Sequence, residues 1–169
     1  MVLGSQYVTG FGGVSRLEGH LFPDTDHVDL PIAAYEGQVP AAVKSWADEN
    51  IGTDIDRPLS LCLVGPSRRG KTKLARQLGK HHYINGTSRG PTAVHTDAQY
   101  AVFDDCPWTK WREWLKPWIG GQKEITVRPL YQNARNVNWG KPAIICVNEL
   151  PDSIRNDDWF SSNVLVVDM

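Results

Sequence analysis

The feature that most constrains this chain is the run GPSRRGKT at residues 65–72, with its glycines at the spacing G-x-x-x-x-G-K-T. The apolar run LSLCLV precedes it, and KTKLARQLGKH, which is expected to form a helix ending near Gly79, follows it. Gly65 and Gly70 allow backbone N–H groups to turn inward around an anion, and the start of a helix adds partial positive charge. The spacing therefore predicts a P-loop that binds the phosphates of a nucleotide.

The side chains of this loop have separate expected roles. Lys71 is expected to reach the β and γ phosphates, and Thr72 to hold Mg²⁺ through its hydroxyl. ATP and Mg²⁺ are the ligands that the motif predicts. The nucleotide-binding residues are expected to be Gly65, Pro66, Ser67, Arg68, Arg69, Gly70, Lys71, Thr72 and Lys73.

Two later apolar runs also end in polar residues. YAVFDD ends in Asp104 and Asp105, where one carboxylate is expected to hold Mg²⁺ and the other to orient or activate the attacking water. PAIICVN ends in Asn148, whose amide can donate to a γ-phosphate oxygen and accept from a water. A solvated turn is the alternative for both. Their order after a P-loop favours Lys71, Asp104, Asp105 and Asn148 as catalytic residues.

The apolar runs also predict the fold class. Short buried strands that alternate with helices indicate an α/β domain with a parallel-sheet core of the P-loop NTPase type. We expect an extended or poorly ordered arm at 1–38, a helical segment and linker at 39–56, and the P-loop domain at 57–169. Within this domain, TKWREWLKPWIG predicts an aromatic helix interrupted by Pro117, and EITVRPLY with ARNVNW predicts a hairpin.

Composition limits the function classes. Hydrophobic residues at 41%, charged residues at 22% and a net charge of −1 describe a globular protein without a global field for nucleic acid. The apolar runs are shorter than the roughly 18 residues of a membrane span, and the first residues lack a signal-peptide pattern, so an intracellular protein without a membrane partner is expected.

The cysteines, tryptophans and histidines are further candidates for metal binding or base stacking, but their positions favour structural roles. Cys62, Cys106 and Cys146 lie in or beside apolar runs and are expected to be buried thiols. The clustered tryptophans are expected to pack together rather than to stack on bases. The histidines lack ligand spacing and are interpreted as surface groups; these are His81, His82 and His95.

Three motifs in this order resemble a known family. GPSRRGKT, VFDD and IICVN resemble motifs A, B and C of superfamily 3 helicases, most closely those of replication initiator (Rep) proteins of geminiviruses and genomoviruses, whose genomes are circular single-stranded DNA. WREWLKPWIGGQKEITV and DDWFSSNVLVVD support the resemblance, which covers residues 39–169. It implies the AAA+-like helicase domain of a rolling-circle initiator, which hydrolyses ATP and moves on single-stranded DNA.

The resemblance also implies partners and a location. The family assembles as a ring, as a hexamer, and the segment from Pro40 to about Asp56 corresponds to its oligomerisation region. Such a ring ATPase needs a cation from the neighbouring subunit, for which Arg155 is the candidate and a solvated arginine the alternative. Host replication proteins are further expected partners, and the host nucleus is the implied location.

The hairpin between motifs B and C is the expected DNA contact. Its DNA-binding residues are expected to be Lys123, Arg128, Tyr131, Arg135 and Lys141, which would grip phosphates without reading sequence. The family tends to have a lysine immediately before the tyrosine that matches Tyr131, where this chain has Leu130. A hairpin whose charges face only water is the alternative.

The family normally carries an N-terminal endonuclease domain, but residues 1–60 supply neither its His-hydrophobic-His motif nor its catalytic tyrosine, so DNA nicking is not expected.

Two other functions remain open for this chain. A small nucleotide kinase also uses a P-loop, although an arginine-rich lid and an acceptor site are not evident. A non-catalytic assembly or repressor fragment would keep the ring and the DNA contacts without turnover.

Overall fold

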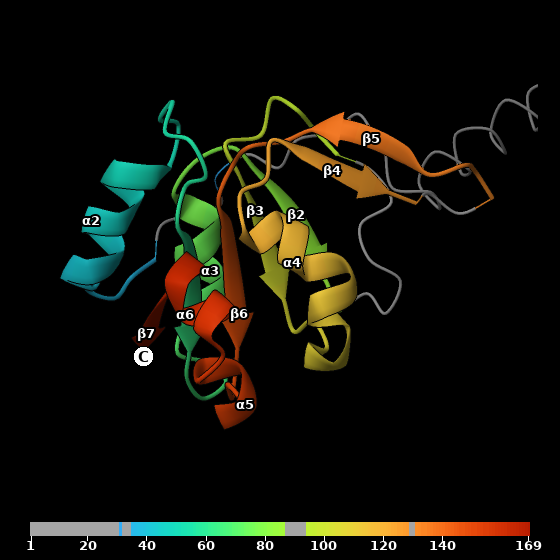
Figure 1. Cartoon of the computed structure of the whole chain (residues 1–169). Coiled ribbons are helices and arrows are strands. Elements are labelled where there is room, and N and C mark those ends of the chain that lie inside the picture. Colours follow the sequence, from blue (N-terminus) through green and yellow to red (C-terminus); the bar gives the residue numbers. More distant parts are fainter. Residues whose placement is uncertain (1–30, 32–34, 87–93, 129–130) are drawn as a thin grey trace, which may run out of the picture.

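The computed structural model describes residues 31, 35–86, 94–128 and 131–169. In this part of the chain, a five-stranded sheet lies between two layers of helices, and a separate two-stranded hairpin projects from it (Figure 1). The predicted α/β class is therefore confirmed. Most of the predicted arm at 1–38 lies outside the described residues.

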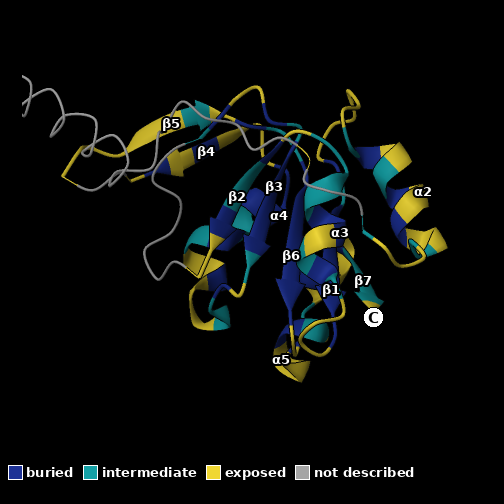
Figure 2. Ribbon diagram, turned by 180° about the vertical axis from the view of Figure 1, so that it is seen from behind, coloured by how far each residue is buried: buried dark blue, intermediate teal, exposed yellow. Residues whose placement is uncertain are grey.

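The main sheet is parallel throughout. Its strands are β1 (Ser60–Val64), β2 (His81–Asn85), β3 (Tyr100–Asp104), β6 (Ala143–Val147) and β7 (Val164–Asp168), in the spatial order β2-β3-β6-β1-β7. All residues of β1 and β6 are buried, as expected for strands covered on both faces (Figure 2). Because β6 lies between β1 and β3, the residue that follows β6 lies between the loops after those two strands.

Helices cover each face of the sheet. They are α2 (Ala41–Asn50), α3 (Lys71–Gln77), the 3₁₀ turn η1 (Trp108–Lys110), the π-helical turn η2 (Trp111–Leu115), α4 (Lys116–Ile119), α5 (Asp152–Arg155) and α6 (Asp158–Asn163). Alternate residues of a strand point to opposite faces. Leu61 and Leu63 accordingly share a hydrophobic cluster with residues of α2 and α3, whereas Cys62 and Val64 share one with η2, α4 and α6.

The aromatic segment packs as the sequence predicts. The side chains of Trp111, Trp118 and Trp139 are at most 5% exposed and belong to one cluster, so packing rather than base stacking accounts for them. Pro117 does not stop the segment. It stands in the first turn of α4, where the missing N–H costs no helical bond, and the segment runs as η1, η2 and α4.

The interpretation of the histidines as surface groups is wrong. His81 is fully buried in β2, a strand that was not predicted, and its ring stacks on Tyr100 with centroids 5.5 Å apart. His95 is also buried, and half-buried His82 stacks on Trp118 with centroids 6.0 Å apart. β2 is an edge strand of the sheet, and its histidine rings pack on aromatic side chains. The polar residue types of this stretch do not reveal that packing.

The projecting hairpin consists of β4 (Glu124–Val127) and β5 (Arg135–Asn138), paired antiparallel as predicted. Ile125 and Val127 are 2% exposed and join the core, while the alternate residues of β4 face solvent. The hairpin is therefore attached at one face and exposed on the other (Figure 2).

The cysteines are buried free thiols, as predicted. Burial raises the pKa of the Cys62 thiol to about 12. Among the described residues, every helix is too short or too polar to span a bilayer.

Candidate nucleotide-binding site

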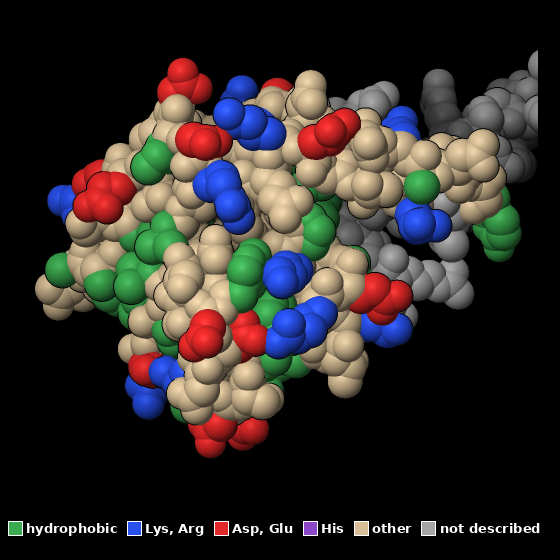
Figure 3. All heavy atoms as spheres, viewed as in Figure 1, with side chains coloured by type: hydrophobic (Ala, Val, Ile, Leu, Met, Phe, Trp, Pro, Cys, Tyr) green, Lys and Arg blue, Asp and Glu red, His purple; other side chains and the backbone are tan. Residues whose placement is uncertain are grey.

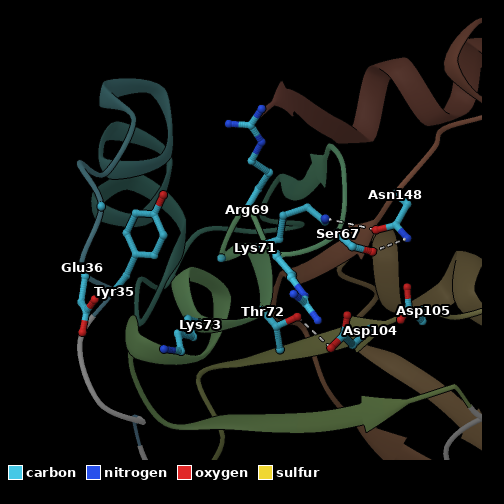
Figure 4. Close-up of a pocket in the computed structure, with 13 residues that line it drawn as sticks. Tyr35, Glu36, Ser67, Arg69, Lys71, Thr72, Lys73, Asp104, Asp105 and Asn148 are labelled. Atoms are coloured by element: carbon cyan, nitrogen blue, oxygen red, sulfur yellow. Dashed lines mark hydrogen bonds between the residues drawn. The ribbon is translucent and has the colours of Figure 1, made fainter.

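The site lies at the carboxyl edge of the main sheet. Parallel strands end at the same edge, so the loop after β1, Asp104 at the end of β3 and Asn148 after β6 come together there. They surround a cavity of about 640 Å³ (Figure 4). Its lining residues are Tyr35, Glu36, Gly37, Ser67, Arg68, Arg69, Gly70, Lys71, Thr72, Lys73, Asp104, Asp105 and Asn148.

Two glycines allow the loop to take its shape. Gly70 has φ +82°, a left-handed conformation that favours glycine, immediately before α3. At Gly65 a Cβ atom would lie 2.4 Å from the backbone oxygen of Met169, a contact that real Cβ atoms do not make. Arg68 also has a positive φ, +65°, which is uncommon for a non-glycine residue. The two glycines of the G-x-x-x-x-G spacing therefore stand at positions where the backbone excludes a side chain or disfavours one.

Lys71 is buried at the centre of the site. Its ammonium donates to the carbonyl oxygens of Gly65 and Pro66, at 2.7 and 2.9 Å, and to Oδ1 of Asn148 at 3.2 Å. The side chain is 7% exposed, and these three acceptors are neutral. A buried cation held by neutral oxygens beside a cavity keeps its attraction for an anion.

Thr72 and Asp104 form the second part of the site. The Thr72 hydroxyl donates to Oδ2 of Asp104 at 2.9 Å, and the Tyr83 hydroxyl donates to the same oxygen at 2.8 Å. Both bonds use one carboxylate oxygen, so Oδ1 of Asp104 receives neither of them. A hydroxyl and a carboxylate oxygen side by side are the hard ligands that Mg²⁺ prefers.

The types of ligand at Thr72 and Asp104 can be compared with those that Mg²⁺ takes in proteins. Mg²⁺ is usually held by one or two carboxylates together with waters and substrate phosphates, rather than in an all-protein cage. The residues present therefore fit this ion as a companion of a bound triphosphate.

Asn148 and Asp105 occupy the same end of the cavity (Figure 4). The Asn148 amide accepts from Lys71 through Oδ1, and its Nδ2 donates to the Ser67 hydroxyl at 3.2 Å. Asp105 is exposed, has φ +51°, and its backbone N–H donates to the Cys146 carbonyl at 3.2 Å. The fold thus places both Asp105 and Asn148 beside the loop, as their order in the sequence predicted.

Tyr83 is a site residue that sequence reasoning missed. The Arg76 guanidinium lies 4.0 Å from the centroid of its ring. Burial, and then the hydrogen bond to Asp104, raise the pKa of the Tyr83 hydroxyl, which therefore stays protonated and able to donate. The run HHYIN between Gly79 and Gly86 is a short aromatic stretch bounded by turn residues, which could have indicated this strand.

Tyr35, Glu36 and Gly37 were also missed. They line the cavity although they belong to the segment interpreted as an arm. Gly65 and Pro66 are outside the lining residues and contribute through their carbonyl oxygens.

Arg155 is not brought to the cavity of its own chain. Its guanidinium forms an ion pair with Asp168 at 2.9 Å, and it is not among the lining residues. A role of Arg155 toward the nucleotide of another subunit stays a prediction, and a solvated arginine paired with Asp168 is the alternative.

The five residues predicted to bind DNA fall into two groups. Arg128, Tyr131 and Arg135 are exposed on the hairpin, whose outer part shows basic side chains (Figure 3). Lys123 forms an ion pair with Asp56 at 3.2 Å. The Lys141 ammonium donates to the backbone oxygens of Thr96 and Ala98, and burial lowers its pKa. These bonds indicate a structural role for Lys141.

Known proteins were compared with the chain. No protein-family model matches it. It is 33% identical to the replication-associated protein of Chloris striate mosaic virus over 154 residues, which cover 86% of this chain and 42% of that protein. The corresponding protein of Bean yellow dwarf virus is 41% identical over 103 residues, covering 61% and 28%. The chain thus spans less than half the length of these relatives.

A solved structure shares the fold. A crystal structure of JCV helicase with a bound small organic compound superposes with a TM-score of 0.51 at 18% identity, covering 77% of this chain and 41% of that one. The match to the Chloris striate mosaic virus protein is longer than residues 39–169, the range on which the resemblance was based. The chain is therefore a relative of the geminiviral replication-associated proteins, and it shares its fold with JCV helicase.

Proposed function

We propose that this chain is the ATP-hydrolysing motor domain of a viral replication initiator, acting on single-stranded DNA. The observation that carries the proposal is the buried Lys71 ammonium, held by neutral oxygens beside a cavity that also contains the Thr72–Asp104 pair. The kinship with viral replication-associated proteins and the helicase fold support the same conclusion.

Each polar residue then has a role toward ATP. Lys71 and the loop N–H groups bind the phosphates, and Thr72 and Asp104 hold Mg²⁺, which neutralises phosphate charge. Asp105 accepts the proton of the attacking water while the bond between the terminal phosphorus and its bridging oxygen breaks, giving ADP and phosphate. Asn148, bonded to Lys71, responds to the presence of the terminal phosphate.

The exposed hairpin provides the contact with DNA. Arg128 and Arg135 bind the backbone phosphates of a single strand, and Tyr131 offers a ring for a base. In a homo-oligomeric ring, taken as a hexamer, hydrolysis at subunit interfaces moves these hairpins along the strand. Arg155 acts there on the neighbouring subunit's nucleotide after leaving Asp168.

The test is ATP hydrolysis with and without single-stranded DNA, comparing the wild-type chain with Lys71→Ala over a range of protein concentrations. We expect DNA to stimulate turnover and the substitution to abolish it. A wild-type chain that binds ATP without DNA-dependent turnover at any concentration would contradict the motor assignment and favour an assembly or repressor fragment. Phosphate transfer to a nucleoside monophosphate would favour a kinase.

A further inference from the structure

The cavity contains an aromatic side chain that none of the roles above uses. Tyr35 lines it together with Glu36 and Gly37, which precede α2 by only a few residues. The segment is thus part of the site although the motif lies some thirty residues further along the chain.

The positions of the labelled side chains give the site a direction. In Figure 4, Tyr35 and Glu36 lie on one side of the loop, and Asn148 and Asp105 lie on the other, with Lys71 between them. The groups proposed to act on the terminal phosphate are therefore on the side away from Tyr35. A nucleotide whose terminal phosphate lies near Asn148 extends its base toward Tyr35.

Two glycines make room for the Tyr35 ring. A Cβ atom at Gly70 would lie 2.4 Å from the ring, and one at Gly37 would lie 2.5 Å from it. The ring also packs on the hydrophobic cluster that includes α2 and α3, and the Tyr35 backbone N–H donates to Oε1 of Gln77 at 2.5 Å. These contacts fix the ring next to the phosphate loop by connecting its segment to α3.

We propose that Tyr35 is the platform on which the base of the nucleotide stacks. The inference rests on the proposed function, since it assigns the base end of that same nucleotide site. An aromatic ring supports any base through its π-face, and in nucleic-acid complexes such stacking strengthens binding by roughly 5- to 150-fold per base. Stacking here contributes affinity for nucleoside triphosphates in general rather than selection of adenine.

The experiment is equilibrium binding of ATP, GTP and inorganic tripolyphosphate, measured by calorimetry on the wild-type chain, Tyr35→Ala and Tyr35→Phe. We expect Tyr35→Ala to raise the Kd for ATP and for GTP about tenfold and to leave the Kd for tripolyphosphate unchanged. Tyr35→Phe keeps the ring and is expected to bind all three as the wild type does. Glu113→Ala, which changes an exposed side chain of η2 outside the cavity lining, is the control for a surface substitution.

The results separate this inference from the proposed function. If Tyr35→Ala binds ATP as the wild type does, or weakens ATP and tripolyphosphate equally, Tyr35 is not a base platform, whatever the activity of the chain. If the wild type binds neither ATP nor tripolyphosphate, or Lys71→Ala binds both unchanged, the nucleotide site itself is wrong. Thermal melting of Tyr35→Ala shows whether the variant is folded. If it is not, Tyr35→Leu tests the stacking, because leucine keeps apolar bulk without an aromatic face: weaker binding of ATP with unchanged binding of tripolyphosphate supports the platform, and wild-type binding of both overturns it.

Discussion

The nucleotide cavity and the β4–β5 hairpin are built in opposite ways. The cavity combines side chains from Tyr35 to Asn148, and its polar groups are bonded to one another. The hairpin is a continuous stretch of chain whose polar side chains face solvent. The difference indicates that the cavity is preorganised for one ligand, whereas the hairpin suits a flexible polymer held mainly by its phosphates.

The base of the hairpin connects the two regions. Ile125, Val127 and Trp139 belong to the hydrophobic cluster that lies on the sheet, and the rings of Trp139 and Trp118 have centroids 4.8 Å apart. The hairpin is thus an exposed ribbon on a buried support. The same cluster contains Phe103 and Val147, which directly precede Asp104 and Asn148 in the chain, so the hairpin and this end of the cavity rest on one packed core.

The largest expected effect is on the buried support. Trp139→Ala should lower the free energy of unfolding by about 3–5 kcal/mol, because it leaves a cavity beside Trp118. Urea unfolding measures this loss. Trp139→Phe should lose much less, since the Trp139 indole N–H is buried without a hydrogen-bond partner in the described structure and its removal costs no bond.

The tip of the hairpin supplies the contrast. Tyr131 is fully exposed, so Tyr131→Ala should change the free energy of unfolding by less than about 0.5 kcal/mol. Equal losses for Trp139→Ala and Tyr131→Ala would contradict the division into a buried support and an exposed ribbon.

The next effect concerns the cavity. Asp104→Asn should lower kcat for ATP by about 10²–10³-fold, because the metal-binding carboxylate loses its charge while its amide oxygen can still accept from Thr72. Steady-state hydrolysis at several Mg²⁺ concentrations measures the loss. Asp158→Asn, at an exposed position of α6, is the matched control, and a loss of the same size there would contradict a specific role for Asp104.

A smaller effect is expected for the exposed cations. Replacing Arg128 and Arg135 together by alanine should weaken binding to single-stranded DNA and make the slope of log K against log salt less steep by about 1.4, since each lost phosphate contact contributes about 0.7. Fluorescence anisotropy at several salt concentrations measures both quantities. Lys110→Ala, an exposed cation at the end of η1 and outside the hairpin, is the control. An unchanged slope in the double variant would show that the hairpin does not contact DNA phosphates.

The smallest effect is expected at Tyr83. Tyr83→Phe removes one of the two donors to Oδ2 of Asp104, a bond worth about 0.5–1.5 kcal/mol net. The Mg²⁺ concentration for half-maximal hydrolysis should rise about two- to tenfold, while Tyr131→Phe should leave it unchanged. Tyr83 would have no positioning role if the Mg²⁺ dependence stayed the same.

Local chemistry made the core of the site predictable. The spacing from Gly65 to Thr72 has few structural solutions, and the apolar runs that end at Asp104 and Asn148 are typical of buried parallel strands. The same reasoning failed for β2, because its histidines are polar by type yet are buried as aromatic rings. Tyr83 was missed with its strand.

The sequence by itself indicated the loop at residues 65–72, the class of the sheet and the hairpin, because each of these has a recognisable pattern within a short stretch of residues. Only the tertiary structure decided that β6 lies between β1 and β3, which brings Asn148 to Lys71, that Tyr35 lines the cavity, and that Tyr83 donates to Asp104 at its edge. The physical reason is that strand order and the packing of distant segments are determined by burial over the whole fold, which no short stretch of sequence contains.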